Sequence, residues 1–188
     1  NIIGILIFAL IAVIIIRTLE FKPRKVEPAK PEALVLDEDK IVTDMQDMIR
    51  CKTVSYMDEA LVDRAEFAKF EALLKERFPK VHEAATLTKL GVSGLLYHIP
   101  GKSNQKPSVC MAHYDVVPVE EDGWEKPAFD GIIEDGCIWG RGTLDTKGTI
   151  SVDLLMNKVD ESIGGYEEAG VRLQDATVVS LFGADKYL

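Results

Sequence analysis

The sequence predicts an α/β fold, a sandwich whose central mixed sheet is flanked by helices and preceded by an N-terminal transmembrane helix. Strand-like apolar segments alternate with amphipathic segments of helical period between residues 37 and 182. Residues 2–16 form an unbroken apolar run without a charge. The length of 188 residues fits one principal domain.

The charge balance narrows the function classes. The chain has 31 Asp and Glu against 22 Lys and Arg, for a formal net charge of −9. Such a chain repels the phosphate backbone, so we expect no nucleic-acid partner. The same acidity is compatible with a cluster of carboxylates that a cation neutralises.

The apolar run at the N-terminus predicts a membrane anchor over residues 1–17. A helix of fifteen residues is roughly 22 Å long, shorter than the hydrocarbon core of about 30 Å, so residues upstream of Asn1 would complete a span. A signal peptide is the alternative, because its apolar core has about 7 to 15 residues. A third alternative is a helix buried in the core of a soluble protein. No small-x-small cleavage site follows Ile16, which favours a single-pass anchor.

The segment over residues 18–35 reads as a linker. Its three prolines and alternating charges remove both helix continuity and apolar area. The basic residues just after the apolar run favour the cytoplasmic side for this flank, but a more basic segment upstream would reverse that orientation. The side of the membrane therefore stays open.

Residues 36–188 form the predicted folded domain. The expected helices cover residues 37–50, 62–78 and 149–159, and the expected strands cover 81–87, 94–99, 108–117 and 176–182, with a hairpin over 132–139. The run 108–117 lies between two prolines and is apolar almost throughout, which indicates a central strand buried on both faces. The three cysteines, Cys51, Cys110 and Cys137, read as core thiols.

Two polar residues stand at the end of this apolar strand, in Met111-Ala-His-Tyr-Asp-Val-Val-Pro118. Successive strand side chains point to opposite faces, so His113 and Asp115 share one face while Tyr114 turns away. A metal-bound imidazole usually gives its other N–H to a carboxylate, and Asp115 is close enough to accept it. A polar strand end facing solvent is the alternative.

A second polar candidate lies in a glycine-bounded loop, Trp139-Gly-Arg-Gly-Thr-Leu-Asp-Thr-Lys-Gly148. Glycines permit close chain approach and positive φ, so this loop can project the Asp145 carboxylate into a cleft. An N-cap for the following helix is the alternative reading of Asp145.

A third motif lies between these two, Gly123-Trp-Glu-Lys-Pro-Ala-Phe-Asp-Gly131. Together the three motifs resemble the metallopeptidase family twenty of co-catalytic zinc hydrolases. That family includes aminoacylase, carboxypeptidase S, carnosinase-type dipeptidases, acetylornithine deacetylase and succinyl-diaminopimelate desuccinylase. The resemblance covers roughly residues 37–183 and looks nearest to the carboxypeptidase S and N-acyl-amino-acid hydrolase branch.

The resemblance implies a site with two Zn²⁺ ions. It assigns His113 as a ligand of the first zinc, Asp115 as the catalytic residue that orients His113, and Asp145 as the ligand that bridges both zincs. It also implies a cis peptide bond between Asp145 and Thr146. The implied substrate is a small peptide or an N-acyl amino acid. Trp124 and Phe129 either border the substrate cleft or cover the core, and we expect the core.

The sequence departs from the family after its last strand. There the family has a general-base Glu and a zinc-ligand Glu, whereas this chain has Lys186 and Tyr187. A protonated Lys cannot accept a proton from water. The pair Glu167 and Glu168 precedes the strand in a Gly-flanked polar loop and reads as solvated. The chain is therefore expected to be the N-terminal portion of a hydrolase, inactive alone, without the lid and dimerisation domain that a homodimer would need. The alternative is a non-catalytic, membrane-tethered short form with a binding or regulatory role.

Overall fold

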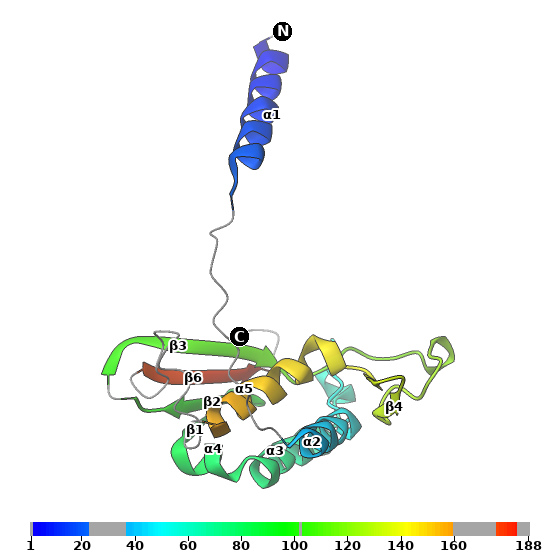
Figure 1. The fold of residues 1–188 in the computed structure, drawn as a ribbon. Coiled ribbons are helices and arrows are strands. Elements are labelled where there is room, and N and C mark those ends of the chain that lie inside the picture. The colour runs from blue at the N-terminus through cyan, green and yellow to red at the C-terminus, as the bar shows by residue number, and fades with distance from the viewer. Residues whose placement is uncertain (1, 23–36, 102, 160–175, 184–188) are drawn as a thin grey trace. The chain divides into compact units, whose positions relative to one another are not determined.

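The computed structural model describes residues 2–22, 37–101, 103–159 and 176–183, and it divides into an N-terminal unit and a larger one that begins near residue 32 (Figure 1). The expected linker lies mostly outside the described residues, as do the loop with Glu167 and Glu168 and the substitutions at Lys186 and Tyr187.

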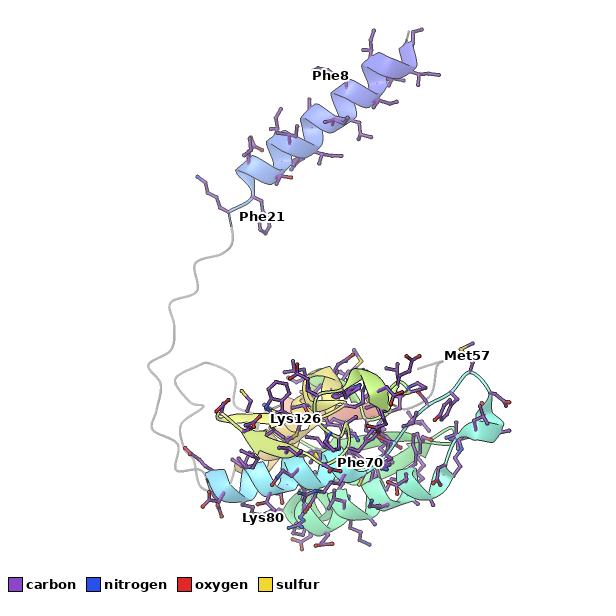
Figure 2. All side chains as sticks on the ribbon, turned by 90° about the vertical axis from the view of Figure 1, so that its right-hand side faces the viewer. Phe8, Phe21, Met57, Phe70, Lys80 and Lys126 are labelled. Carbon is purple, nitrogen blue, oxygen red and sulfur yellow. The ribbon has the colours of Figure 1, made fainter. Side chains whose placement is uncertain are left out.

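The N-terminal unit is one helix, α1 (Ile2–Glu20), slightly longer than the predicted anchor. Apolar side chains project around its whole circumference, with Phe8 in its N-terminal half and Phe21 just beyond its C-terminal end (Figure 2). Within the described residues it is the single helix long and apolar enough to cross a membrane, a property that signal sequences share.

The larger unit is built on a four-stranded sheet in the order β1-β2-β6-β3. The strands are β1 (Thr86–Leu90), β2 (Gly94–Ile99), β3 (Ser103–His113) and β6 (Ala176–Gly183). β1 pairs with β2 and β2 pairs with β6, both in antiparallel fashion, whereas β3 runs parallel to β6. The sheet is therefore mixed, as predicted, and β3 is an edge strand among the described residues.

Four helices supply the core beside this sheet: α2 (Glu38–Arg50), α3 (Arg64–Arg77), α4 (Pro79–Ala84) and α5 (Gly148–Val159). Their starts follow from local hydrogen bonding, since Asp37 caps α2 through the Lys40 N–H and Asp63 caps α3 through the Ala65 N–H. The main apolar cluster joins all four helices to β2 and to Tyr114, with the members Met48, Cys51, Phe67, Phe70, Leu74, Phe78, Val81, Leu95, Tyr97, Tyr114, Ile150 and Leu154.

An aromatic stack lies in the middle of this cluster. The Phe70 and Tyr114 rings are 4.8 Å apart between centroids with an angle of 1° between their planes, and Phe67 meets Tyr114 at 5.7 Å. The Tyr114 hydroxyl donates to the Ser93 carbonyl at 2.5 Å. Figure 2 labels Phe70 within the larger unit. The aromatic residues Phe67 and Phe70 of α3 are thus core contacts.

The predicted strand over residues 81–87 is wrong. Pro79 opens the short helix α4 instead, because a proline is well suited to the first turn, where its missing N–H costs nothing. Val81 then packs into the core as a helical residue. The strand begins only at Thr86.

The prediction that residues 108–117 form a strand buried on both faces is also wrong in two respects. The strand ends at His113, and the side chains of Val109 and Met111 are 56% and 70% exposed. The helices pack on one face of β3, so the alternate residues Cys110 and Ala112 are half-buried while their neighbours face away.

A separate two-stranded hairpin, β4 (Ile132–Glu134) and β5 (Cys137–Trp139), confirms the predicted one. Asp135 and Gly136 have φ of 51° and 73°, the left-handed conformation that a two-residue hairpin turn requires. Cys137 on β5 is exposed, so its assignment as a core thiol is wrong. Cys51 is buried and Cys110 half-buried.

The aromatic stack leads to a stability prediction. Phe70→Ala leaves a cavity beneath Tyr114 and is expected to lower the free energy of unfolding by about 3 to 5 kcal/mol, measured by urea denaturation. Leu61→Ala, in the short helix η1 (Glu59–Leu61), is the control because its side chain is 62% exposed. It is expected to change the unfolding free energy by at most about 0.5 kcal/mol. Equal losses in both variants would contradict the assignment of Phe70 to the core.

Candidate metal centre

The first half of the site is the end of β3. Tyr114 is fully buried, and its two neighbours, His113 at the end of β3 and Asp115 just beyond it, turn away from the core and meet. His113 Nδ1 lies 3.2 Å from Asp115 Oδ1 and 3.0 Å from the Asp115 carbonyl oxygen. The arrangement matches the pairing of His113 with Asp115 expected from their spacing.

The second half of the site is the irregular turn η3 (Thr143–Lys147), which carries Asp145. Two glycines bring this turn against the core. A Cβ on Gly140 would lie 2.5 Å from Ile49 Cγ2, and Gly142 has a φ of 86° with a Cβ position 2.7 Å from Val116 Cγ1. The peptide bond between Asp145 and Thr146 is cis, as the resemblance implies.

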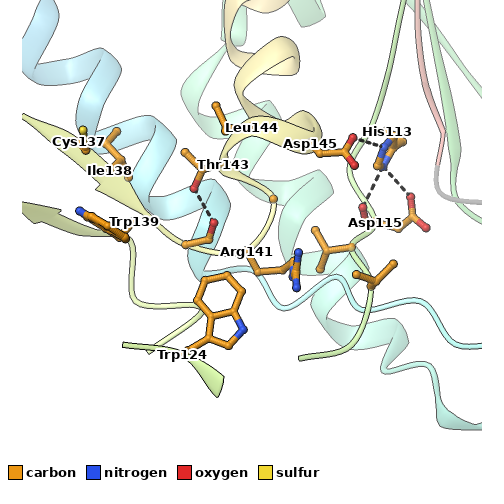
Figure 3. A pocket seen from close by; sticks show the side chains of 14 residues that line it. His113, Asp115, Trp124, Cys137, Ile138, Trp139, Arg141, Thr143, Leu144 and Asp145 are labelled. Atoms are coloured by element: carbon orange, nitrogen blue, oxygen red, sulfur yellow. Dashed lines mark hydrogen bonds and ion pairs between the residues drawn. The ribbon is translucent and has the colours of Figure 1, made fainter. Parts of the chain in front are cut away.

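The end of β3 and the turn η3 bring their polar side chains together. His113 Nε2 lies 3.0 Å from Asp145 Oδ1, although the two residues are 32 positions apart in sequence (Figure 3). The structure thus brings together all three residues that the sequence singled out. Asp145 is largely exposed, whereas Asp115 is mostly covered.

The surroundings of the imidazole favour a positive charge. Partial burial by itself lowers the pKa of His113. The hydrogen bonds to the Asp115 carbonyl and the Asp145 carboxylate, together with the charges of both aspartates, outweigh burial and raise the pKa above its usual value. A neutral imidazole has a single N–H and cannot donate to acceptors at both nitrogens. The position between Nε2 and Asp145 therefore suits a proton or a metal cation.

Ser55 is a member of the site that the sequence analysis missed. Its hydroxyl donates to Asp115 Oδ2 at 2.7 Å, which holds the carboxylate in the orientation that contacts His113. The segment bearing Ser55 is fixed by backbone bonds to the chain after β3, from Ser55 N–H to the Val116 carbonyl and from Val116 N–H to the Thr53 carbonyl. No local pattern signals this contact, because the partners are 60 residues apart.

Lys147 anchors the other side of the turn. Its side chain is fully buried, and Nζ donates to the carbonyls of Met48 at 2.9 Å and Cys51 at 2.7 Å, at the end of α2. Nζ also lies 5.3 Å from the centre of the Phe70 ring. Burial lowers the pKa of Lys147 to about 8. The motif contains this residue, but its sequence context gives no sign that the ammonium is buried.

A pocket of about 690 Å³ opens beside the site. His113, Asp115 and Asp145 lie at its wall, together with apolar side chains from the hairpin and the turn and one guanidinium. These further lining residues include Trp124, Ile138, Trp139, Arg141 and Leu144. Trp124 thus borders the pocket, contrary to the expectation, and it also packs against the small cluster that contains Phe129, which is buried as expected.

The donor set fits part of a zinc site. Imidazole nitrogen and carboxylate oxygen are both zinc ligands, and the carboxylate on the far ring nitrogen is the usual orienting partner. Within the described residues, however, no group of three or more His, Cys, Asp or Glu side chains gathers closely enough to hold a metal ion. His113 and Asp145 are therefore two donors of a larger set.

Comparison with known sequences identifies the family of these motifs. Residues 109–155 match the model of peptidase family M20/M25/M40. The chain is 32% identical to a probable carboxypeptidase S-like 2 of Dictyostelium discoideum, over 97% of this chain and 36% of that protein. It is also 32% identical to the N-fatty-acyl-amino acid synthase/hydrolase PM20D1 of Xenopus tropicalis, over 75% of this chain and 29% of that protein. The chain thus spans about a third of the length of these relatives.

Comparison with solved structures agrees on the fold. The di-peptidase Dug1p from Saccharomyces cerevisiae superposes with a TM-score of 0.59 at 21% identity, over 78% of this chain and 32% of that one. An M20 family metallo-carboxypeptidase, Sso-CP2 from Sulfolobus solfataricus, gives 0.57 at 22% identity, over 78% of this chain and 30% of that one. The sequence matches, with the motifs around His113 and Asp145 inside the matched segment, identify the chain as a member of the M20 peptidase family.

Proposed function

We propose that this chain supplies part of the active site of a zinc-dependent hydrolase that cleaves a peptide bond or an N-acyl amide bond. The observation that carries the proposal is the approach of His113 Nε2 to Asp145 Oδ1 at 3.0 Å beside a large pocket. The names of the relatives, a carboxypeptidase and an N-acyl amino acid hydrolase, support the same bond type.

The three side chains have different tasks in this proposal. His113 would hold one zinc through Nε2, and Asp145 would serve as a ligand of both zincs. Asp115 fixes the imidazole through Nδ1, so that the lone pair of Nε2 points toward Asp145. Bound zinc supplies Lewis acidity to the scissile carbonyl and to the attacking water. The general base and the other ligands belong to residues outside those described.

The pocket supports a substrate with an apolar group next to the scissile bond. Trp124, Ile138 and Trp139 form apolar walls, which remove hydrocarbon surface from water. Arg141 lies 5.0 Å from the Trp124 ring and brings a positive charge to the same pocket. That charge suits the free carboxylate that both peptides and N-acyl amino acids carry.

The proposed organisation places a single-pass anchor at residues 1–17, a linker at 18–35 and the N-terminal part of the catalytic domain at 36–188. The anchor rests on the length and apolar composition of α1. Residues 1–188 alone are proposed to be inactive, because Lys186 and Tyr187 stand where the family carries its general base and a ligand.

The same two residues favour the second candidate, a non-catalytic membrane-tethered form. Hydrolysis of N-acyl amino acids and dipeptides by purified protein separates the two candidates. The assay is made with the full-length protein that contains this sequence, with and without a chelator. Chelator-sensitive turnover supports the hydrolase, and zinc-replete protein without turnover supports the non-catalytic form.

Asp145→Asn tests the shared ligand. The amide keeps the shape of the side chain but removes the charge that two cations require. Mutation of a residue that only supports a metal ligand lowers metal affinity or activity about 10- to 100-fold. For the proposed ligand itself we therefore expect at least about a 100-fold loss of zinc affinity and of kcat/KM. Metal content after dialysis and turnover are the measurements. Asp122→Asn, at an exposed position, is the control. Two tightly held zincs in the Asp145→Asn protein would exclude the assigned role.

Ser55→Ala tests the orientation of Asp115. Losing the hydroxyl frees the carboxylate to rotate away from His113, so zinc affinity is expected to fall about tenfold. The free energy of unfolding should fall by only about 1 kcal/mol. Competition with a chromophoric chelator measures the affinity. Ser55→Thr keeps a hydroxyl and should stay near the unmodified value. An unchanged affinity in Ser55→Ala would show that Asp115 needs no support.

Trp139→Ala tests the apolar wall. We expect kcat/KM for a substrate with a long acyl chain to fall about 10- to 100-fold, the effect of losing about 1 to 3 kcal/mol of apolar contact. The value for an N-acetyl substrate should change less than about threefold, since its acyl group is too short to reach the ring. Ile133→Ala, on the partner strand of the hairpin but outside the pocket lining, is the control. Equal losses for both substrates would refute the assigned wall.

A further inference from the structure

Thr146 makes an unusual pair of hydrogen bonds with a single residue. Its hydroxyl donates to the His113 carbonyl at 2.8 Å and accepts from the His113 N–H at 2.9 Å. One side-chain oxygen on the turn therefore satisfies both backbone groups of the proposed zinc ligand on the strand.

The position of His113 in the sheet explains why these groups need a partner. Within the described residues β3 is the edge strand, with β6 on one side, and its pairing with β6 ends at His113 and Gly183. The N–H and C=O of one strand residue point to the same edge of the strand. The Thr146 hydroxyl takes the place that a neighbouring strand would have there. It can do so because a hydroxyl both donates and accepts.

Thr146 is also the immediate neighbour of Asp145, and the residue after it is Lys147, which is bound to the end of α2. The Asp145 side chain itself is 83% exposed, so packing around it does not hold it. Its position follows from the backbone of the two residues after it, Thr146 and Lys147, which are both held by hydrogen bonds. Of these two anchoring residues, only Thr146 forms hydrogen bonds with His113.

We propose that Thr146 is a positioning residue that sets the separation between the His113 and Asp145 ligands. It does so by bonding the His113 main chain with its own hydroxyl. The proposal rests on the proposed function, since it presumes that both residues bind zinc. It assigns to Thr146 no contact with substrate or metal.

The test compares three variants of the full-length protein that contains this sequence. Thr146→Val keeps the branched shape without a hydroxyl, and Thr146→Ser keeps the hydroxyl. Thr146→Ala replaces the valine variant if that one yields too little folded protein. Thr53→Val is the matched control, because its hydroxyl donates to the carbonyl of Tyr114, the neighbour of His113, at 2.5 Å.

The first measurement is hydrogen exchange of the His113 amide in metal-free protein. Thr146→Val is expected to exchange this amide at least about tenfold faster than the unmodified protein, because its acceptor is gone. Thr146→Ser and Thr53→Val should keep the protection. An unchanged rate in Thr146→Val would overturn the proposal at its first step.

The second measurement is metal binding, as zinc affinity and as the visible spectrum of the cobalt-substituted protein. For Thr146→Val we expect zinc affinity to fall about 10- to 100-fold, the usual effect of losing a partner of a metal ligand, with an altered cobalt spectrum. Thr146→Ser and Thr53→Val should stay within about threefold, with the unmodified spectrum.

Two results would overturn the positioning role. In the first, Thr146→Val loses the amide protection yet keeps the affinity and the spectrum. In the second, Thr53→Val weakens zinc binding as much as Thr146→Val does, which would indicate general destabilisation. Failure of the unmodified protein to bind zinc would instead overturn the proposed function. The exchange measurement on metal-free protein would still decide whether the Thr146 bond exists.

Discussion

One aromatic ring in the core, Phe70, contacts the supports of both arms of the candidate centre. It stacks on Tyr114, whose burial turns His113 and Asp115 outward, and it lies beside the ammonium of Lys147, which anchors the turn bearing Asp145. The end of β3 and the turn η3 are thus both supported by the same side chain of α3. A catalytic constellation requires such support, because its ligands must be held within about 0.5 Å of their working geometry.

Much of this arrangement could be predicted from short-range patterns. The alternation of strand side chains paired His113 with Asp115, local turn signals predicted the hairpin over residues 132–139, and the glycines around Asp145 indicated a loop that can project its carboxylate into a cleft. Each of these rules depends on residues a few positions apart. They paired His113 with Asp115, whereas the resemblance to the zinc hydrolases was needed to join Asp145 to them.

The errors and omissions arise where distant segments decide the outcome. Local apolar content indicated a strand at Val81, but Pro79 and the core surface beneath it favoured a helix. The apolar run around Met111 suggested burial on both faces, yet the described helices cover one face. Ser55 and Thr146 were missed because their partners lie 60 and 33 positions away, at contacts that only the folded chain creates.

The exposed sulfur on β5 has a practical consequence. Cys137 lines the pocket and is exposed, whereas burial raises the thiol pKa of both Cys51 and Cys110 and so keeps them in the less reactive protonated form. Among the thiols of residues 1–188, a mild alkylating dye would thus attach first at the pocket mouth. The fluorescence of the dye attached to the hairpin would then report whether a ligand occupies the pocket.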